Sequence, residues 1–263
     1  KSIAAGCDMF LFFNNIEEDF GFMLKGYQNG VITEERLTDA LRRILGLKAK
    51  LHLPEKQANG TLLRTREDLN VIGCEEHLQW RAEAADKGIS LIKDTQNNLT
   101  INPVDHKRIR LYMLEGEKGG ITDNGSKAQQ LFVDELTKRG YEVTVNERGS
   151  RVKGATLKYR DEVDFALEVA DIAGYGAQNN YRIQWSTAMA NEVPWFVWEV
   201  PHAFVSLNFT THLHDATMVK TFVNAYHNNE ETIKQVIDKL EGKSEFKGGH
   251  NDLVWTDKWQ AKL

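Results

Sequence analysis

The sequence predicts an α/β protein in which a mainly parallel sheet carries helices on both faces, as in a flavodoxin-like α/β/α sandwich. Short apolar segments alternate with helical segments from about residue 75 onward, which is the pattern of a doubly wound sheet. The chain has 263 residues, of which 41% are hydrophobic and 10% aromatic, so it can fill one large or two modest domains. A polar segment around residue 60 divides it.

The first fifty residues predict one strand and two helices. Met9–Phe13 is a continuous apolar run, which is typical of a strand covered on both faces, and it stops at Asn14 and Asn15. Apolar residues at helical spacing then predict a helix that ends near Gly30. Thr33, followed by two glutamates, is a good N-cap for the next helix.

Residues 54–71 have the composition of a connection between domains, so we expect a first domain at residues 1–53 and a second at residues 72–263. In the second domain the apolar segments predict strands at Ile89–Ile92, Ile109–Leu114, Tyr141–Val145, Asp171–Tyr175 and Phe204–Leu207. The helical patterns fall at Ser126–Arg139, Tyr159–Ala170, Ala216–Ala225 and Glu230–Leu240.

Charge and cysteine content exclude several classes of protein. Lys and Arg number 33 against 38 Asp and Glu, so the sequence favours neither a nucleic-acid surface nor a polybasic membrane patch. No apolar stretch approaches the roughly 20 residues that span a bilayer. Cys7 and Cys74 fit no disulfide framework or zinc motif, and no metal or organic cofactor is implied. The compartment and the oligomeric state stay open.

Four motifs, taken in chain order, resemble segments of one enzyme family. They are Ala4–Met9, Gly30–Lys48 with its Arg43-Ile44-Leu45 pattern, Glu76–Lys93, and Val200–Asn208 together with Thr221–Tyr226. Each motif alone is weak, but their order and spacing resemble the C-terminal portion of family 3 glycoside hydrolases, in the β-N-acetylglucosaminidase branch. The resemblance implies that residues 1–53 are the last strand and helices of a TIM barrel, and that residues 72–263 are the family's second domain.

The resemblance also implies where the reaction residues lie. The family's aspartate nucleophile precedes the first motif, so we expect it outside this chain, and retaining hydrolysis needs that carboxylate about 5 Å from a proton donor. In the β-glucosidase branch the donor is a glutamate of the second domain, whereas in the acetylglucosaminidase branch it is a histidine on a barrel loop. The corresponding stretch here, residues 174–182, contains no carboxylate. The chain alone is therefore expected to be inactive.

Asn14 and Asn15 are the candidate substrate-binding residues. They follow the predicted last barrel strand, and TIM barrels bind substrate at the carboxyl ends of their strands. Their amides suit sugar hydroxyls or an acetamido group, although asparagine also simply ends strands. Asp8, at the other end of the strand, is expected to be structural.

Other polar motifs carry weaker hypotheses. Residues 116–120 are glycine-rich but lack a phosphate-loop signature, so a surface loop is favoured. His212 and His214 with Asp215 lack a third clear metal ligand, and capping or surface polarity is favoured. A sugar-stacking lip is a further hypothesis, with core packing as the alternative for its tryptophan. Its members would be Tyr175, Tyr181, Arg182 and Trp185.

The favoured hypothesis is the C-terminal part of a β-N-acetylhexosaminidase that acts on amino-sugar glycans through its missing barrel, in a bacterial cytoplasm or cell envelope. A β-glucosidase-branch enzyme is the first alternative, favoured if Asp161 or Glu162 faces the sugar pocket. The second alternative is a non-catalytic carbohydrate-binding or interaction module.

Overall fold

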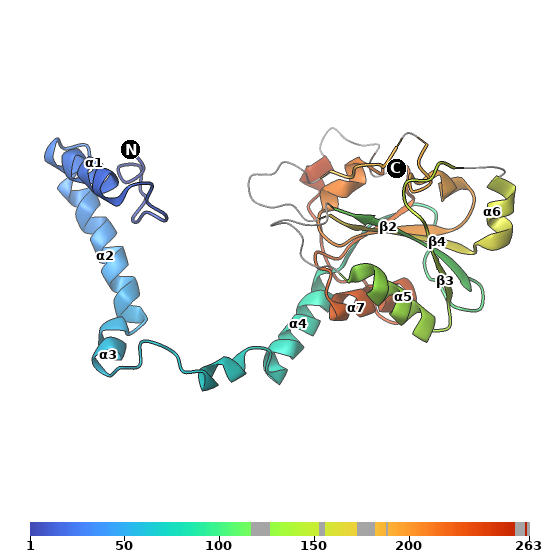
Figure 1. Cartoon of the computed structure of the whole chain (residues 1–263), viewed down its shortest axis with the longest axis horizontal. Helices are drawn as coiled ribbons and strands as arrows, with labels where there is room; N and C mark the ends of the chain where they lie inside the picture. Colours follow the sequence, from blue (N-terminus) through green and yellow to red (C-terminus); the bar gives the residue numbers. More distant parts are fainter. Residues whose placement is uncertain (117–126, 153–155, 173–181, 188, 256–260, 262–263) are drawn as a thin grey trace. The chain divides into compact units, whose positions relative to one another are not determined.

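The computed structural model describes residues 1–116, 127–152, 156–172, 182–187, 189–255 and 261. The chain forms two compact units, residues 1–74 and residues 75–263, and each is described by itself (Figure 1). The helices of the first unit are α1 (Ile16–Gln28), α2 (Glu34–Lys50), α3 (Leu53–Ala58) and the 3-10 helix η1 (Glu67–Val71). The predicted connection, residues 54–71, thus contains most of α3 and all of η1.

Side-chain caps begin the two long helices of the first unit. The side chain of Asn15 accepts hydrogen bonds from two amides at the start of α1, and Thr33 accepts one at the start of α2. Met9–Phe13 forms no strand, which corrects the prediction, and four-fifths or more of Leu11 and Phe12 is exposed. A strand needs a hydrogen-bonded neighbour, and the described residues of this unit supply none.

Asp8 is structural, as predicted, because it joins the segment before the apolar run to α2. Its carboxylate pairs with Arg36 and, at 3.2 Å, with Nε of Arg43. Arg36 also pairs with Asp39 and donates from Nε to the carbonyl of Ile3 at 3.0 Å. The network ties residues 3–8 to one face of α2.

The second unit is an α/β sandwich around a six-stranded sheet. Its strands are β1 (Ser90–Asp94), β2 (Arg108–Glu115), β3 (Glu142–Val145), β4 (Phe165–Asp171), β5 (His202–Ser206) and β6 (Thr221–Asn224). Its helices are α4 (Glu75–Gly88), α5 (Ala128–Lys138), α6 (Thr156–Glu162), η2 (Trp195–Trp198), η3 (Thr210–His214), α7 (Glu230–Leu240) and η4 (Asp252–Trp255).

The strand order is β1-β6-β5-β4-β2-β3, and every pair is parallel except β1 with β6. The five parallel strands alone follow the flavodoxin-like order, so the predicted fold class is confirmed. β1 extends this sheet as an antiparallel edge strand beside β6.

Two predicted helices are wrong. Half of Tyr159–Ala170 is the strand β4, its first residues are the end of the short helix α6, and the predicted helix Ala216–Ala225 contains the strand β6. Every residue of β4 and β6 is buried, so neither strand shows the polar alternation that distinguishes a strand from a buried helix. The strand predicted at Asp171–Tyr175 begins at the last residue of β4, and residues 173–175 lie outside the described residues.

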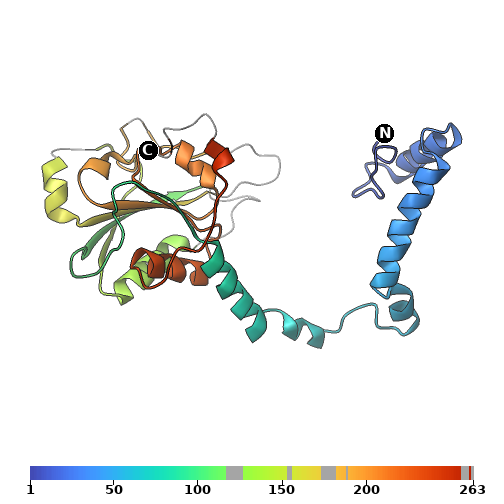
Figure 2. The ribbon, with the colours of Figure 1, turned by 180° about the vertical axis from the view of Figure 1, so that it is seen from behind.

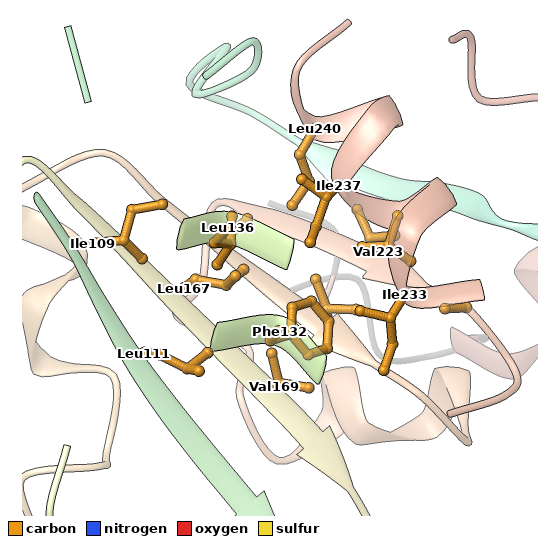
Figure 3. Packing of buried hydrophobic residues seen from close by; sticks show 14 of the residues in the cluster. Ile109, Leu111, Phe132, Leu136, Leu167, Val169, Val223, Ile233, Ile237 and Leu240 are labelled. Atoms are coloured by element: carbon orange, nitrogen blue, oxygen red, sulfur yellow. The ribbon is translucent and has the colours of Figure 1, made fainter. Parts of the chain in front are cut away.

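Apolar side chains cover both faces of the sheet. On one face α5 and α7 lie side by side, and both views of the ribbon place them on the same side of the strands (Figures 1 and 2). Figure 3 shows Phe132 and Leu136 of α5 meeting Ile233 and Ile237 of α7 over the strand residue Leu167. On the other face an aromatic core gathers Tyr112, Phe196, Phe204, Phe222 and Trp255.

Candidate functional site

The carboxyl edge of the parallel sheet is the place where this fold binds ligands. Open α/β sheets hold ligands outside the carboxyl ends of their strands, where successive connections leave in opposite directions. Here that switch point lies between β2 and β4, because the chain leaves β2 toward β3 on one side and enters β4 on the other. The groups at this edge come from the ends of β2, β3, β4, β5 and β6 and the segments that follow them.

The exit of β4 is tied to three neighbouring segments. Asp171, the last residue of β4, is 6% exposed and accepts two hydrogen bonds from the amide of Asn228, at 3.1 and 3.3 Å. Its carbonyl accepts from the N–H of Gly116 at 3.2 Å. The next N–H, that of Ile172, donates to the side chain of Asn208 at 2.6 Å. The backbone therefore leaves the central strand in a fixed direction.

Arg148, three residues after β3, bridges the switch point. One guanidinium nitrogen donates to the carbonyl of Glu115 at the end of β2, at 2.9 Å, and the other donates to the carbonyl of Gln184 at 2.6 Å. Its Nε lies 3.7 Å from a carboxylate oxygen of Glu192. One side chain thus joins the end of β2 to the segment that precedes η2.

Glu192 is 1% exposed and organises the backbone around it. It accepts hydrogen bonds from the N–H of Ser186 at 2.9 Å and of Gly149 at 3.3 Å. Burial raises the pKa of Glu192, but the bonds from Ser186 and from backbone amides outweigh burial, so its pKa lies below the usual value. The carboxylate is ionised at neutral pH and is a fixed negative charge beneath this edge.

A second buried carboxyl group, Glu168 of β4, is in the opposite state. It is 1% exposed, and among the residues that the structure describes neither of its oxygens has a hydrogen-bond partner. Burial, and then the negative charge of Glu192, raise the pKa of Glu168 well above its usual value. Burial therefore favours the protonated form of Glu168, which lies close to the hydrogen-bonded hydroxyls of Tyr112 and Tyr159.

The proposed sugar-stacking lip is only partly within the described residues. Tyr175 and Tyr181 lie outside them. Arg182 forms an ion pair with Asp215, which also accepts the N–H of Ile183 at 3.0 Å. Asp215 thus holds Arg182 and the backbone of Ile183, in place of the capping or surface role favoured from sequence. Trp185 is partly buried against the aromatic core, which agrees with the packing alternative.

His212 and His214 both contact other groups of the second unit. His212 is fully buried, and its Nδ1 lies 2.9 Å from the hydroxyl of Ser206. His214 Nε2 lies 3.2 Å from the carbonyl of Val254.

Within the described part of the chain no group of three or more His, Cys, Asp or Glu side chains could hold a metal ion. No helix in that part is long and apolar enough to cross a bilayer.

Asp161 and Glu162 lie at the end of α6, just before β4 begins, so they belong to the amino edge of the sheet. The carbonyl of Asp161 accepts a hydrogen bond from Arg108, the first residue of β2, which agrees with this position. The two carboxylates are therefore at the opposite edge from the switch point.

Asn14 and Asn15 differ in what their side chains do. Asn15 Oδ1 accepts the N–H groups of Glu17 and Glu18, each at 3.1 Å, as the cap of α1. The backbone N–H of Asn14 donates to Asp19 at 3.1 Å, and its side chain has no hydrogen bond within the described residues. Of the two amides, that of Asn14 is available to a ligand.

Sequence reasoning missed the residues that shape the carboxyl edge, above all Arg148 and Glu192. Both stand in segments without regular periodicity, and only the strand order shows that the segments following β2, β3 and β4 meet. A signal was available in the position of Arg148 after an apolar strand, because side chains that follow parallel strands gather at one edge.

Comparisons with known proteins agree with this architecture. The chain is 35% identical over 268 residues, covering all of it and 47% of the relative, to a protein from Cellulomonas fimi named beta-N-acetylglucosaminidase/beta-glucosidase. It is 34% identical to the solved structure of the beta-glucoside phosphorylase BglX, with a TM-score of 0.79 over 99% of this chain and 46% of that one.

A family 3 beta-N-acetylglucosaminidase from Paenibacillus sp. str. FPU-7 shares the fold, with a TM-score of 0.61 at 19% identity over 94% of this chain and 45% of that one. No family model matches the chain. The chain belongs to glycoside hydrolase family 3 and corresponds to the C-terminal portion of its members. It spans about half the length of the relatives that it matches.

Proposed function

We propose that the complete protein is a β-N-acetylglucosaminidase that cleaves amino-sugar glycans with retention of configuration. The identity of 35% to the Cellulomonas fimi enzyme across the whole chain carries this proposal. That relative's name includes activity on both acetylglucosaminides and glucosides. The carboxylates at the carboxyl edge of the sheet favour the acetylglucosaminide as substrate, for the following reason. Two buried carboxylates there, Asp171 and Glu192, are both hydrogen-bonded within the fold, so neither of these two is free to protonate a leaving group.

In this proposal the nucleophile and proton donor lie on residues outside the chain. The boundaries we propose are residues 1–53 for the barrel portion, 54–71 for the connection and 72–263 for the second domain. Asn14 supplies an amide to the sugar, because its side chain is unengaged whereas that of Asn15 caps α1. Asn15 then acts indirectly, because its cap on α1 fixes the direction of the chain that follows Asn14.

A second candidate is phosphorolysis, favoured by the likeness to BglX, which is named a beta-glucoside phosphorylase. In both reactions the glycosidic C–O bond breaks and the leaving group takes a proton. Water gives the free sugar, and inorganic phosphate gives the sugar 1-phosphate. The two candidates therefore differ in the acceptor.

The test uses the complete enzyme with 4-nitrophenyl β-N-acetylglucosaminide and 4-nitrophenyl β-glucoside, with and without inorganic phosphate. We expect a higher kcat/KM for the acetylglucosaminide and the free sugar as product. Preference for the glucoside would contradict the proposed branch, and a phosphate-dependent sugar 1-phosphate would establish the second candidate. Residues 1–263 alone should release no nitrophenol above background.

Asn14→Ala in the complete enzyme tests the proposed sugar contact. Loss of one buried hydrogen bond should reduce kcat/KM by about 1–3 kcal/mol of transition-state stabilisation, with an unchanged melting temperature. Unchanged kinetics with a lower melting temperature would assign Asn14 to a structural role instead.

A further inference from the structure

The segment that follows α7 passes from one face of the sheet to the other. Phe246 packs against the apolar core on the face that α5 and α7 cover, whereas Trp255, 4% exposed, belongs to the aromatic core on the opposite face. We call residues 245–255 the strap. Between these two side chains the strap passes around an edge of the sheet, and its contacts identify that edge as the strand β1.

The strap lies against the main chain at the start of β1. The N–H of Gly248 donates to the carbonyl of Ile89 at 3.1 Å, and the hydroxyl of Ser90 donates to the carbonyl of Gly249 at 2.9 Å. A Cβ atom at Gly248 would collide with the backbone oxygens of Gly88 and Ile89, so only glycine permits this close approach.

An ion-pair network holds the strap just before the crossing. Lys247 pairs with the carboxylate of Asp86 in α4 at 2.6 Å. Lys239 of α7, whose side chain is fully buried, donates to the same carboxylate at 2.9 Å and to the carbonyl of Glu245 at 2.6 Å. The beginning of the strap is therefore fixed to two helices.

Lys93 of β1 holds the chain beyond the strap. It is 4% exposed, and its Nζ donates to the carbonyl of Thr217 at 3.0 Å and to that of Ala261 at 3.2 Å. Burial of an ammonium group costs free energy unless hydrogen bonds offset the loss of water. The strand that the strap crosses thus also binds the main chain near the C-terminus.

We propose that the strap closes the β1 edge of the sheet against pairing with a second copy of the protein. β1 is an edge strand, and an edge strand presents main-chain N–H and C=O groups to any other strand that reaches it. A second copy carries the same edge, and two such edges related by a twofold axis can pair as antiparallel strands. Covering an edge with a loop is one way in which proteins prevent this pairing.

The other edge of the sheet is protected differently, which supports the proposal. β3 is four residues long and begins at the exposed Glu142, which pairs with Lys107 at 3.0 Å. Short length and charged side chains discourage pairing at an edge. β1 has no exposed residue, and its lysine, Lys93, is buried, so side chains of β1 do not supply this protection. The strap supplies it instead.

The experiment compares Gly248→Val with Gly249→Val in the complete enzyme. A Cβ atom at Gly248 meets backbone oxygens, whereas one at Gly249 would meet no described atom within 4 Å apart from its chain neighbours, so Gly249→Val is the matched control. We expect Gly248→Val to raise the amide exchange rates of β1 about tenfold while β2 and β4 stay protected. Sedimentation velocity should show dimers of Gly248→Val that increase with protein concentration, and the wild-type state for Gly249→Val.

Ser90→Ala provides a second measurement if Gly248→Val does not fold. It removes the hydroxyl that holds Gly249, so exchange of β1 and association should rise in the same direction by a smaller factor. A folded Gly248→Val with wild-type exchange in β1, or with the wild-type association state, would overturn the inference. Equal association of Gly249→Val would also overturn it, as would wild-type behaviour of Ser90→Ala where that variant decides.

Discussion

The two units of the chain show two ways in which sequence specifies structure. In the first unit, residues 1–74, helices begin at side-chain caps, yet its buried apolar residues are just Ile3, Ile32 and Ala40. In the second unit, residues 75–263, both faces of a sheet are packed with apolar side chains. Local signals suffice to define a helix, whereas a stable domain needs a closed core.

The largest predicted contrast is in core substitution. Leu167 of β4 is fully buried, so Leu167→Ala should lower the free energy of unfolding of the second unit by about 2–5 kcal/mol. Leu45 of α2 is 60% exposed, so Leu45→Ala should change stability by less than about 0.5 kcal/mol. Urea unfolding of the two variants tests the contrast, and equal effects would contradict it.

Acid pH should also lower the stability of the second unit. Burial lowers the pKa of His202 to about 4, and its Nε2 accepts the N–H of Lys220 at 2.8 Å. Between pH 6.5 and 4 the unfolded chain binds a proton that the folded chain does not, so stability is present above pH 6.5 and is lost as pH falls. The loss from this group should be about 2 kcal/mol between pH 7 and pH 5.

His202→Gln should remove this part of the pH dependence. The control is His52→Gln, which replaces an exposed histidine of the first unit and should leave the dependence unchanged. Denaturant unfolding at both pH values measures it. Parallel pH curves for His202→Gln and wild type would show that His202 titrates alike in the folded and unfolded states.

How far sequence predicts structure depends on the kind of signal. The bounds of α7, Glu230–Leu240, agree with the prediction because an asparagine cap and a one-sided apolar face mark it. β4 and β6 were misassigned, because strands buried on both faces lack alternation. Arg148 and Glu192 were missed from sequence, since their contacts depend on the strand order.

A smaller effect separates the two asparagines of the first unit. Asn15→Ala removes the cap of α1 and should destabilise that helix by about 1 kcal/mol, whereas Asn15→Asp keeps an acceptor and should be nearly neutral. Asn14→Ala is the matched control, because its side chain bonds to nothing within the described residues. Circular dichroism of the complete enzyme compares the helicity of the variants, and a loss in Asn14→Ala equal to that in Asn15→Ala would contradict these roles.

The central claim is that the second unit is stable by its own core, while the first needs surfaces supplied by the rest of the complete protein. Hydrogen exchange of residues 1–263 and of the complete enzyme tests it most directly. We predict that β2, β4 and β5 are equally protected in both, and that α1 and α2 are protected only in the complete enzyme. Equal protection of α1, α2 and the sheet in residues 1–263 alone would contradict the account.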